Sequence, residues 1–298
     1  MSIRCLQILL FVILLMSGGT KAHSSSYALL VGISHYSSNN TGWDDINGVN
    51  DIRILHGALQ QQGFAIDTLT ENEASAANIR SAIQNLTTRI KMNDTIYMHF
   101  SGHGQPVEDA DGDEPDGWDE AFVPFDAPMW YKSGIYEGGN HLTDDEFNIY
   151  FKRIRQKIGE QGLLVVVFDA CHSGTMYREG DEVSVDDEAA VRGTYIGFSK
   201  TQEYHPLREQ KPTCHYDIRQ EDNLSPIVIL EACQAWQQNM EVAIDGKYFG
   251  PLSYSVYNQL KTKAISHIAQ KPDDMQGYMQ SIIPSWRKQQ MVIEQSVR

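Results

Sequence analysis

Two apolar runs that each end in a glycine turn constrain the fold of this chain more than any other feature. Residues 165–168 are apolar and mostly β-branched, and they are followed by Asp169, Cys171 and a Ser-Gly turn. An uninterrupted run of this kind is typical of a strand buried on both faces. Residues 95–100 repeat the design and lead to His103 between two glycines. Ligands of open α/β sheets bind outside the carboxyl ends of the strands, so this thiol and imidazole are a candidate nucleophile and base.

Apolar runs and helical repeats alternate along most of the chain. Besides the two strands above, we expect strands at 27–33, 64–69 and 227–232, and helices at 49–63, 76–92, 143–159 and 252–265. The helices are indicated by apolar residues at helical spacing, and Thr143 and Glu146 are spaced as a capping box. Strands that alternate with helices predict an α/β fold with right-handed crossovers, a mostly parallel sheet and helices on both faces.

The periodic pattern fails between residues 176 and 223. This stretch has few regularly spaced apolar residues and carries scattered basic ones: Arg178, Arg192, Lys200, Arg208, Lys211 and Arg219. A long irregular stretch inside a compact domain is usually functional or disordered. We therefore expect one domain over residues 23–298 that contains an irregular loop.

The first 22 residues predict a secretory signal peptide. Arg4 precedes an apolar run at 6–16 and then small residues up to Ala22. An uncleaved anchor is the alternative, although the run is short for a membrane span. Cleavage removes Arg4, Lys21 and no acidic residue, which changes the formal net charge from −15 to −17. We expect an exported, periplasmic or secreted monomer without a stable membrane span.

The acidic balance also limits the partners of the chain. Nucleic acid is not expected, because it is bound by a basic face. A net negative charge suits solubility, cationic substrates or bound cations.

Three cysteines remain once Cys5 has left with the signal peptide: Cys171, Cys214 and Cys233. An odd number in an exported chain means at least one free thiol or an intermolecular bridge. A disulfide between Cys214 and Cys233 would suit an oxidising compartment. The chain has no Cys-x-x-Cys pair, so a thiolate zinc site is not expected.

Cys171 has the best position for chemistry. A cysteine nucleophile needs a base that holds it as a thiolate and donors for the oxygen that becomes negative on attack. His103 is the candidate base, and the backbone N–H groups of Gly104 and Cys171 are the candidate oxyanion donors. The alternative is a buried cysteine beside a core histidine.

The two strand-end motifs resemble those of a known family. Ser-Gly-His-Gly at 101–104 and Asp-Ala-Cys-His-Ser-Gly at 169–174 look like the motifs of metacaspases and bacterial caspase-like cysteine peptidases. The similarity covers roughly residues 27–262 and includes 28–33, 48–51, 109–120 and 142–146. Metazoan caspases carry Gln-Ala-Cys and a shorter interval between histidine and cysteine, which favours the metacaspase side. The resemblance implies a caspase-hemoglobinase fold, a three-layer sandwich around the sheet.

The resemblance also implies a cysteine endopeptidase that cuts after Arg or Lys. In such relatives an acidic pocket selects the basic side chain, and the matching positions here are Asp51, Ser101 and Asp169. Two carboxylates at the sheet edge would accept a guanidinium fork. Alone, Asp51 could instead be an acid at a helix start, and Asp169 a turn residue. Many relatives cut themselves in the basic stretch after the cysteine, which makes self-processing an expectation here.

Calcium is a further expectation from the resemblance, as an activator and not as a group required for the chemistry. Some metacaspases are activated by calcium, with ligands that resemble Asp119, Asp144 and Asp145. The acidic run at 109–120 is not an EF-hand, because Glu114 stands where that loop needs glycine. The alternative is a solvated acidic loop.

The chain departs from the family at the strand that ends in Cys233. Relatives often have Ser-Ala there, so we expect a different cleft floor, although Gln234 and Glu241 follow as in relatives. Two rival functions stay open. One is a non-catalytic caspase-like binding module, and the other is a metal-dependent hydrolase that uses the run at 109–120 with His103 and His172. Neither rival needs a thiol at position 171.

Overall fold

The computed structural model describes residues 24–112, 114, 116–171, 189–201, 214–285, 287 and 289–297. Its centre is a seven-stranded sheet with the order β2-β1-β3-β7-β9-β12-β8. The bounds are β1 Ser26–Gly32, β2 Ala65–Thr70, β3 Thr95–Ser101, β7 Leu163–Asp169, β8 His215–Arg219, β9 Ile227–Glu231 and β12 Val292–Val297. The strands from β2 to β9 in this order are parallel, and β12 runs antiparallel to β9.

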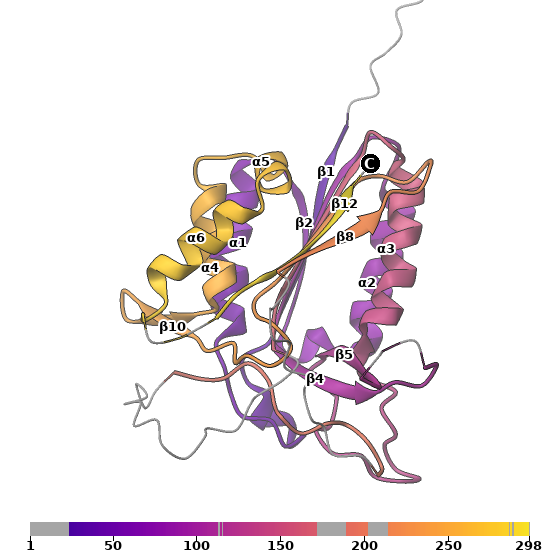
Figure 1. The fold of residues 1–298 in the computed structure, drawn as a ribbon, viewed down its shortest axis with the longest axis vertical. Coiled ribbons are helices and arrows are strands. Elements are labelled where there is room, and N and C mark those ends of the chain that lie inside the picture. The colour runs from indigo at the N-terminus through magenta and orange to yellow at the C-terminus, as the bar shows by residue number, and fades with distance from the viewer. Residues whose placement is uncertain are drawn as a thin grey trace, which may run out of the picture.

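Helices cover both faces of this sheet (Figure 1). One layer contains α1 (Gly48–Gln61), α4 (Pro251–Leu260), α5 (Ile265–Gln270) and α6 (Asp273–Ile282), and the other contains α2 (Ala76–Arg89) and α3 (Asp144–Ile158). The predicted α/β sandwich with a mostly parallel sheet is therefore confirmed. The order of the strands places β3 and β7 side by side near the middle of the sheet.

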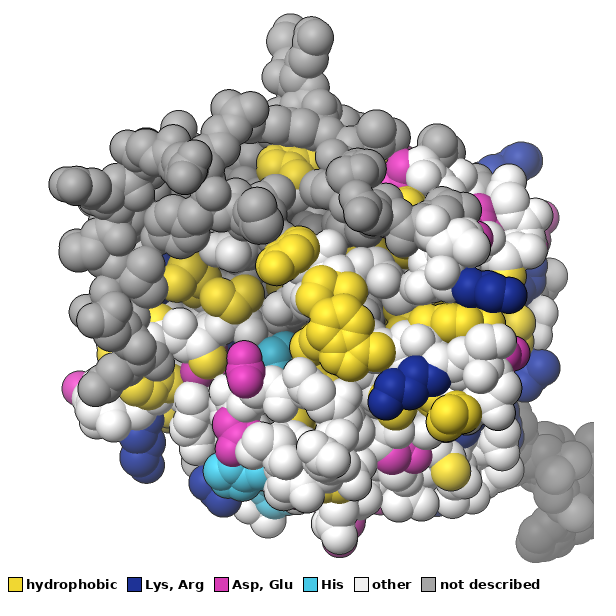
Figure 2. Space-filling model, turned by 90° about the horizontal axis from the view of Figure 1, so that it is seen from below, with side chains coloured by type: hydrophobic (Ala, Val, Ile, Leu, Met, Phe, Trp, Pro, Cys, Tyr) yellow, Lys and Arg dark blue, Asp and Glu magenta, His cyan; other side chains and the backbone are white. Residues whose placement is uncertain are grey.

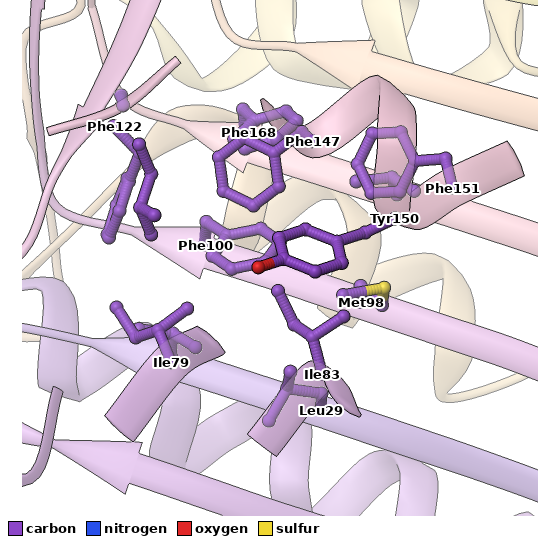
Figure 3. Close-up of a cluster of buried hydrophobic side chains, with 14 of the residues drawn as sticks. Leu29, Ile79, Ile83, Met98, Phe100, Phe122, Phe147, Tyr150, Phe151 and Phe168 are labelled. Atoms are coloured by element: carbon purple, nitrogen blue, oxygen red, sulfur yellow. The ribbon is translucent and has the colours of Figure 1, made fainter. Parts of the chain in front are cut away.

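An aromatic core fixes these two strands to the layer of α2 and α3. Figure 3 shows Phe100 of β3 and Phe168 of β7 surrounded by apolar side chains from both helices. The rings of Phe100 and Phe168 are stacked with centroids 5.0 Å apart, and Phe147 meets both at their edges. Phe100 and Phe168 immediately precede Ser101 and Asp169, so this packing fixes where the two strands end.

Two small sheets lie outside the central one. The first consists of β4 (His103–Glu108), β5 (Trp118–Val123) and β6 (Leu142–Thr143), and the second of β10 (Val242–Ile244) and β11 (Lys247–Phe249). Figure 1 shows β4 and β5 at the lower end of the molecule, and β4 begins two residues after β3 ends. His103 therefore begins a short strand, whereas the sequence predicted a glycine turn.

The structure differs from the predicted elements in the C-terminal third. The helix expected at 252–265 is two helices, because the Gln62 side chain of α1 donates hydrogen bonds to the carbonyls of Leu260 and Lys263 at 2.8 Å each. This contact caps α4 from outside its own sequence. Strand β8 lies within the stretch expected to be irregular, and its mostly exposed residues carry no apolar pattern.

Several expectations fall outside the described residues. The predicted signal peptide at 1–22, His172 and much of the 176–223 stretch belong to this group. Within the described part of the chain, none of the helices has the length and apolar character needed to cross a membrane. The Thr143 hydroxyl accepts a hydrogen bond from the Glu146 N–H, as expected, but the Glu146 carboxylate binds Arg80 and does not return to Thr143.

Candidate active site

The ends of β3 and β7 bring the two predicted corners together. Ser101 and Asp169 are paired in the parallel register, and His103 and Cys171 each follow two residues later. The backbone N–H groups of Gly104 and Cys171 both donate to the carbonyl oxygen of Arg192, at 3.3 and 2.7 Å. The two predicted oxyanion donors therefore converge on a single carbonyl oxygen. Figure 2 views the molecule from this end and shows apolar side chains gathered there.

His103 is held as a neutral imidazole. Its Nε2 lies 2.9 Å from the carbonyl oxygen of Asp44, which can only accept, so Nε2 carries the proton in this arrangement. Its ring stacks on Trp43 with centroids 4.8 Å apart. Burial lowers the pKa of His103 to about 4. The other nitrogen, Nδ1, is buried and has no hydrogen-bond partner among the described residues, so it is the atom that can accept a proton.

Cys171 is buried beside a second thiol. Its Sγ lies 2.8 Å from the carbonyl oxygen of Gln237 and 3.5 Å from Sγ of Cys233. The hydrogen bond with Cys171, together with burial, raises the pKa of Cys233 well above its usual value. Cys233 is therefore a protonated donor next to Cys171. The Cys214–Cys233 disulfide that the sequence left open is not formed in this structure: Cys233 lies beside Cys171, and the three described cysteines are free.

The three predicted pocket residues surround one guanidinium group, that of Arg192. Asp51, Ser101, Asp169 and Arg192 are fully buried. Nη1 of Arg192 donates to Oδ2 of Asp51 at 2.6 Å and to Oγ of Ser101 at 2.7 Å, and it lies 3.6 Å from Oδ1 of Asp169. Burial raises the pKa of Asp51 to about 7 although Arg192 opposes that shift. Burial alone would lower the pKa of Arg192, but the surrounding carboxylates raise it above its ordinary value.

A third carboxylate, Glu241, completes the pocket; the resemblance marked it as a position that matches relatives but gave it no role in the pocket. Oε1 of Glu241 accepts from Nε and Nη2 of Arg192 at 3.1 and 2.9 Å. Asp169 is held in turn by the Asn239 amide at 2.6 Å and by the Ser253 N–H at 2.6 Å. The available sequence signal was an acidic residue shortly after β9, at the edge where the other pocket residues lie.

The backbone before Gly193 pairs with the segment at 239–241 through an isolated antiparallel bridge and its flanking hydrogen bonds. The Arg192 N–H donates to the carbonyl of Asn239 at 2.9 Å, and the Glu241 N–H donates to the carbonyl of Ala190 at 3.0 Å. Val191 and Met240 form an antiparallel bridge between these two bonds. Arg192 is thus held in three ways: its side chain lies in the pocket, its backbone is paired, and its carbonyl oxygen accepts two N–H groups. These contacts place the bond between Arg192 and Gly193 at the site.

The predicted calcium residues lie near one another at the β5–α3 corner. Ala121 of β5 pairs with Thr143 of β6; Asp119 lies two residues before Ala121, and Asp144 and Asp145 begin α3 directly after Thr143. Burial, followed by the charges of Asp119 and Asp145, raises the pKa of Asp144 to about 7. Oδ1 of Asp144 is buried without a hydrogen-bond partner in the described structure.

The described residues do not form a preassembled metal site. Nowhere in the described ranges do three His, Cys, Asp or Glu side chains come close enough to hold a metal ion. In the acidic loop, the Asp109 carboxylate accepts the N–H groups of Asp111, Gly112 and Glu114 at 2.7–3.0 Å, which closes the loop on itself. The oxygen donors at the β5–α3 corner suit calcium chemically, but they would have to move to coordinate it.

Comparison with known proteins gives consistent matches. The family described as metacaspase, peptidase C14 domain, matches residues 27–178. Metacaspase-1B of Aspergillus fumigatus is 35% identical over 156 residues, which cover 50% of this chain and 35% of that protein. Metacaspase-1B of Aspergillus oryzae is 34% identical over 269 residues, covering 79% of this chain and 60% of that protein. The matched part of the chain thus spans between about a third and three fifths of these relatives.

A solved structure shares the fold. The crystal structure of a Geobacter sulfurreducens protein superposes with a TM-score of 0.56 and 18% identity, covering 92% of this chain and 94% of that one. At this identity the match concerns the fold alone.

Proposed function

Because this chain belongs to the metacaspase family, we propose that it is a cysteine endopeptidase that cuts peptide bonds after a basic residue. In this proposal Cys171 is the nucleophile and His103 the general base. Gly104 and Cys171 supply the oxyanion N–H groups, and Asp51, Ser101 and Asp169 bind the basic side chain.

One observation carries the proposal: the chain's own Arg192 occupies the site as a substrate would. Its guanidinium lies among Asp51, Ser101 and Asp169, while its carbonyl oxygen accepts the N–H groups of Gly104 and Cys171. A buried carboxylate site that binds a guanidinium disfavours neutral and acidic side chains at the same position.

The proposed reaction follows from these positions. Nδ1 of His103 accepts the thiol proton of Cys171, and the thiolate attacks the carbonyl carbon of the residue in the pocket. The oxygen that becomes negative stays bound to the two backbone N–H groups, which cost no reorganisation at that moment. His103 returns the proton to the leaving amine, and a water molecule that His103 then deprotonates hydrolyses the thioester.

The proposal is tested with a short reporter peptide that ends in Arg before the scissile bond. We expect the wild-type chain to cleave it, and Cys171→Ala and His103→Ala each to lower kcat/KM by about three orders of magnitude. Cys214→Ala is the matched control, because Cys214 lies outside the site, and it should retain activity. Equal rates for the wild type and Cys171→Ala would contradict the nucleophile assignment.

Self-processing is part of the same proposal, at the bond between Arg192 and Gly193. The irregular stretch offers several basic residues, but Arg192 is the described one whose carbonyl lies at the oxyanion donors. Mass spectrometry of the purified chain should find a new terminus at Gly193 in the wild type and none in Cys171→Ala. The same fragments in both proteins would exclude self-processing.

The proposal also includes activation by calcium, bound by Asp119, Asp144 and Asp145. The support is the buried Oδ1 of Asp144, which has no hydrogen-bond partner among the described residues, and the pKa of Asp144, which burial and then the charges of Asp119 and Asp145 raise to about 7. A bound cation would favour the ionised carboxylate and give this oxygen a partner. Titration calorimetry with calcium should show binding that Asp119→Asn reduces. Heat changes that are the same in the variant would argue against this site.

The remaining parts of the proposal concern location and partners. We propose export after removal of residues 1–22, on the composition of that segment, and a monomer that acts on peptides and does not bind nucleic acid. N-terminal sequencing of the mature protein tests the first part, since a mature chain that still begins at Met1 would contradict cleavage. Sedimentation velocity of the purified chain tests the second part.

A further inference from the structure

We propose that Cys233 is the resolving thiol of a reversible oxidation site, at which hydrogen peroxide joins Cys171 and Cys233 in a disulfide bond. While the bond is in place, Cys171 has no thiol that could attack a peptide. This consequence rests on the proposed peptidase function, whereas formation of the bond does not. No sequence motif assigns Cys233 a chemical role, and the family resemblance marks its position as a departure.

The two cysteines come from the ends of neighbouring strands. Phe168 of β7 pairs with Glu231 of β9, and the Ala232 N–H donates to the Phe168 carbonyl at 3.0 Å. Cys171 and Cys233 follow shortly after these paired residues. Neighbouring strands lie about 5 Å apart, and disulfide bonds join Cα atoms that are about 4.4–6.8 Å apart. The bond therefore needs no rearrangement of the central sheet.

The two sulfur atoms face each other inside the protein. Sγ of Cys233 lies 3.5 Å from Sγ of Cys171, and both cysteines are buried. The carbonyl oxygen of Gln237 lies 2.8 Å from Sγ of Cys171 and 3.5 Å from Sγ of Cys233, so one acceptor keeps both thiols on the same side. The sulfur atoms need to approach by only about 1.5 Å to reach the length of a disulfide bond.

The proposed oxidation has two steps. Sγ of Cys171 attacks one oxygen of hydrogen peroxide, the O–O bond breaks, and a sulfenic acid forms while the thiol proton and the released hydroxide give water. Sγ of Cys233 then attacks the sulfur of the sulfenic acid, the S–O bond breaks, and the released hydroxide takes the Cys233 proton to give a second water. Two thiols and one peroxide thus give one disulfide and two waters, and the two electrons that the sulfur atoms lose are gained by the peroxide.

The environment of the pair sets the order of these steps. The hydrogen bond with Cys171, and then burial, raises the pKa of Cys233 well above its usual value, so Cys233 stays a thiol. Peroxide oxidises thiolates, so Cys171, which has His103 as its proposed base, reacts first. Oxidation of Cys171 ends the contact that is the largest cause of the raised pKa, and Cys233 is then easier to deprotonate.

The first test maps disulfide bonds in the whole chain and needs neither a variant nor catalysis. The purified chain is treated with hydrogen peroxide, blocked with an alkylating reagent, digested without reductant and analysed by mass spectrometry. We expect at least about four fifths of the chains to carry one bond between Cys171 and Cys233, and dithiothreitol to return both thiols. A bond that involves Cys214 instead, or the absence of a bond after treatment, would overturn the inference.

The second test asks what Cys233 does for Cys171. Cys233→Ser removes the resolving thiol and nearly keeps the size of the side chain, so peroxide should carry Cys171 on to sulfinic and sulfonic acid, at least about fivefold more than in the wild type. Cys214→Ala is the matched control and should form the bond between Cys171 and Cys233 as the wild type does. Equal amounts of these acids in Cys233→Ser and the wild type would contradict the resolving role.

Activity measurements separate this inference from the proposed function. Cleavage of the Arg reporter should fall in proportion to the bridged fraction, by at least about tenfold in a fully bridged chain, and should return with dithiothreitol. Cleavage that persists in the bridged chain would overturn the proposed effect on Cys171. A chain that cleaves no reporter before oxidation would contradict the peptidase proposal, while the disulfide mapping still decides whether the bond forms.

Discussion

Gly193 is the residue that allows Arg192 to enter the site. A Cβ on Gly193 would overlap the carbonyl oxygen and the Cβ of Cys171, both of which belong to a strand end fixed by the core. Only a glycine lets the backbone after Arg192 lie this close to the nucleophile. Binding of the Arg192 side chain in the pocket therefore requires a glycine at the next position.

The substitution Gly193→Ala is therefore predicted to prevent Arg192 from binding in the pocket. We expect the terminus at Gly193 to form at least about tenfold more slowly, because the added methyl group pushes the scissile bond away from Cys171. Mass spectrometry over a time course measures this. Gly57→Ala is the control, since a Cβ at Gly57 meets nothing within 4 Å. Unchanged cleavage in Gly193→Ala would mean that the chain is not cut in the arrangement described here.

A buried histidine beneath the pocket gives a pH prediction. His99 lies between the hydroxyls of Tyr97 and Ser253, at 2.8 and 2.9 Å, and burial lowers its pKa to about 3. In the unfolded chain His99 takes up a proton as the pH falls through about 6.5, whereas in the folded chain it stays neutral. The contribution of neutral His99 to the free energy of unfolding is therefore present above about pH 6.5 and is lost as the pH falls.

We predict that His99→Gln is less stable than the wild type at pH 7.5 and that the difference narrows by about 2 kcal/mol at pH 5, where the wild type has lost that contribution. Urea unfolding at the two pH values measures it. A difference that stays constant or widens on acidification would show that His99 is not held neutral.

At this scale the sequence predicted the residues that belong to local motifs. His103, Gly104, Cys171 and Asp169 stand at the ends of recognisable strands, so their meeting follows from parallel pairing. Arg192 and Glu241 could not be placed in the same way. Both lie in segments whose position depends on tertiary contacts, and an isolated Arg or Glu in an irregular stretch carries no periodic signal.

At the scale of elements, the site depends on the register of β3 and β7. Ser101 pairs with Asp169, and a shift of one residue would turn the pocket side chains to the opposite face of the sheet. The aromatic residues just before these positions oppose such a shift, because Phe100 and Phe168 stack on each other and Phe147 packs against the edges of both (Figure 3).

Truncation of this core is predicted to be costly. Phe100 is completely buried, so Phe100→Ala should lower the free energy of unfolding by about 3–5 kcal/mol. Ile149→Ala on α3 is the control: its side chain is exposed, and the change should remain within about 0.5 kcal/mol. Chemical denaturation measures both. A loss below about 1 kcal/mol for Phe100→Ala would indicate that these rings do not fix the strand ends.

The elements that the sequence predicted well are those with a strong apolar period. The buried parallel strands and the amphipathic helices α1, α2 and α3 lie within a few residues of their expected ranges. The strands β8 and β12 and the break between α4 and α5 were missed. The edge strand β8 is largely exposed, and the break depends on Gln62, a residue from the other end of the chain.

At the scale of the whole molecule, the pocket is filled by a segment from the chain itself. The carboxylates of Asp51, Asp169 and Glu241 come from separate parts of the sequence, and Arg192 neutralises part of their charge. Fully buried carboxylates of this kind need a cationic partner. Under the proposed function, the uncut chain therefore has a closed site, and an external peptide has to displace Arg192 before it can bind.

This arrangement predicts a lag in substrate cleavage. Freshly purified wild-type chain should cleave an Arg reporter slowly at first and then faster, as cutting after Arg192 frees the pocket. Progress curves measured alongside mass spectrometry of the same sample test this relation. Cleavage that is linear from the start, in a sample that contains only uncut chain, would show that the segment does not block the site.

The most direct test of the central claim is covalent labelling with an electrophilic peptide ketone that ends in Arg. The Gly193→Ala variant is used, because in it Arg192 is predicted to leave the site open. We predict one label per chain, mapped by mass spectrometry to Cys171 and strongly reduced by the further change His103→Ala. Labelling of Cys214 or Cys233 in place of Cys171, or equal labelling after His103→Ala, would contradict the claim that the ends of β3 and β7 form a nucleophile and its base.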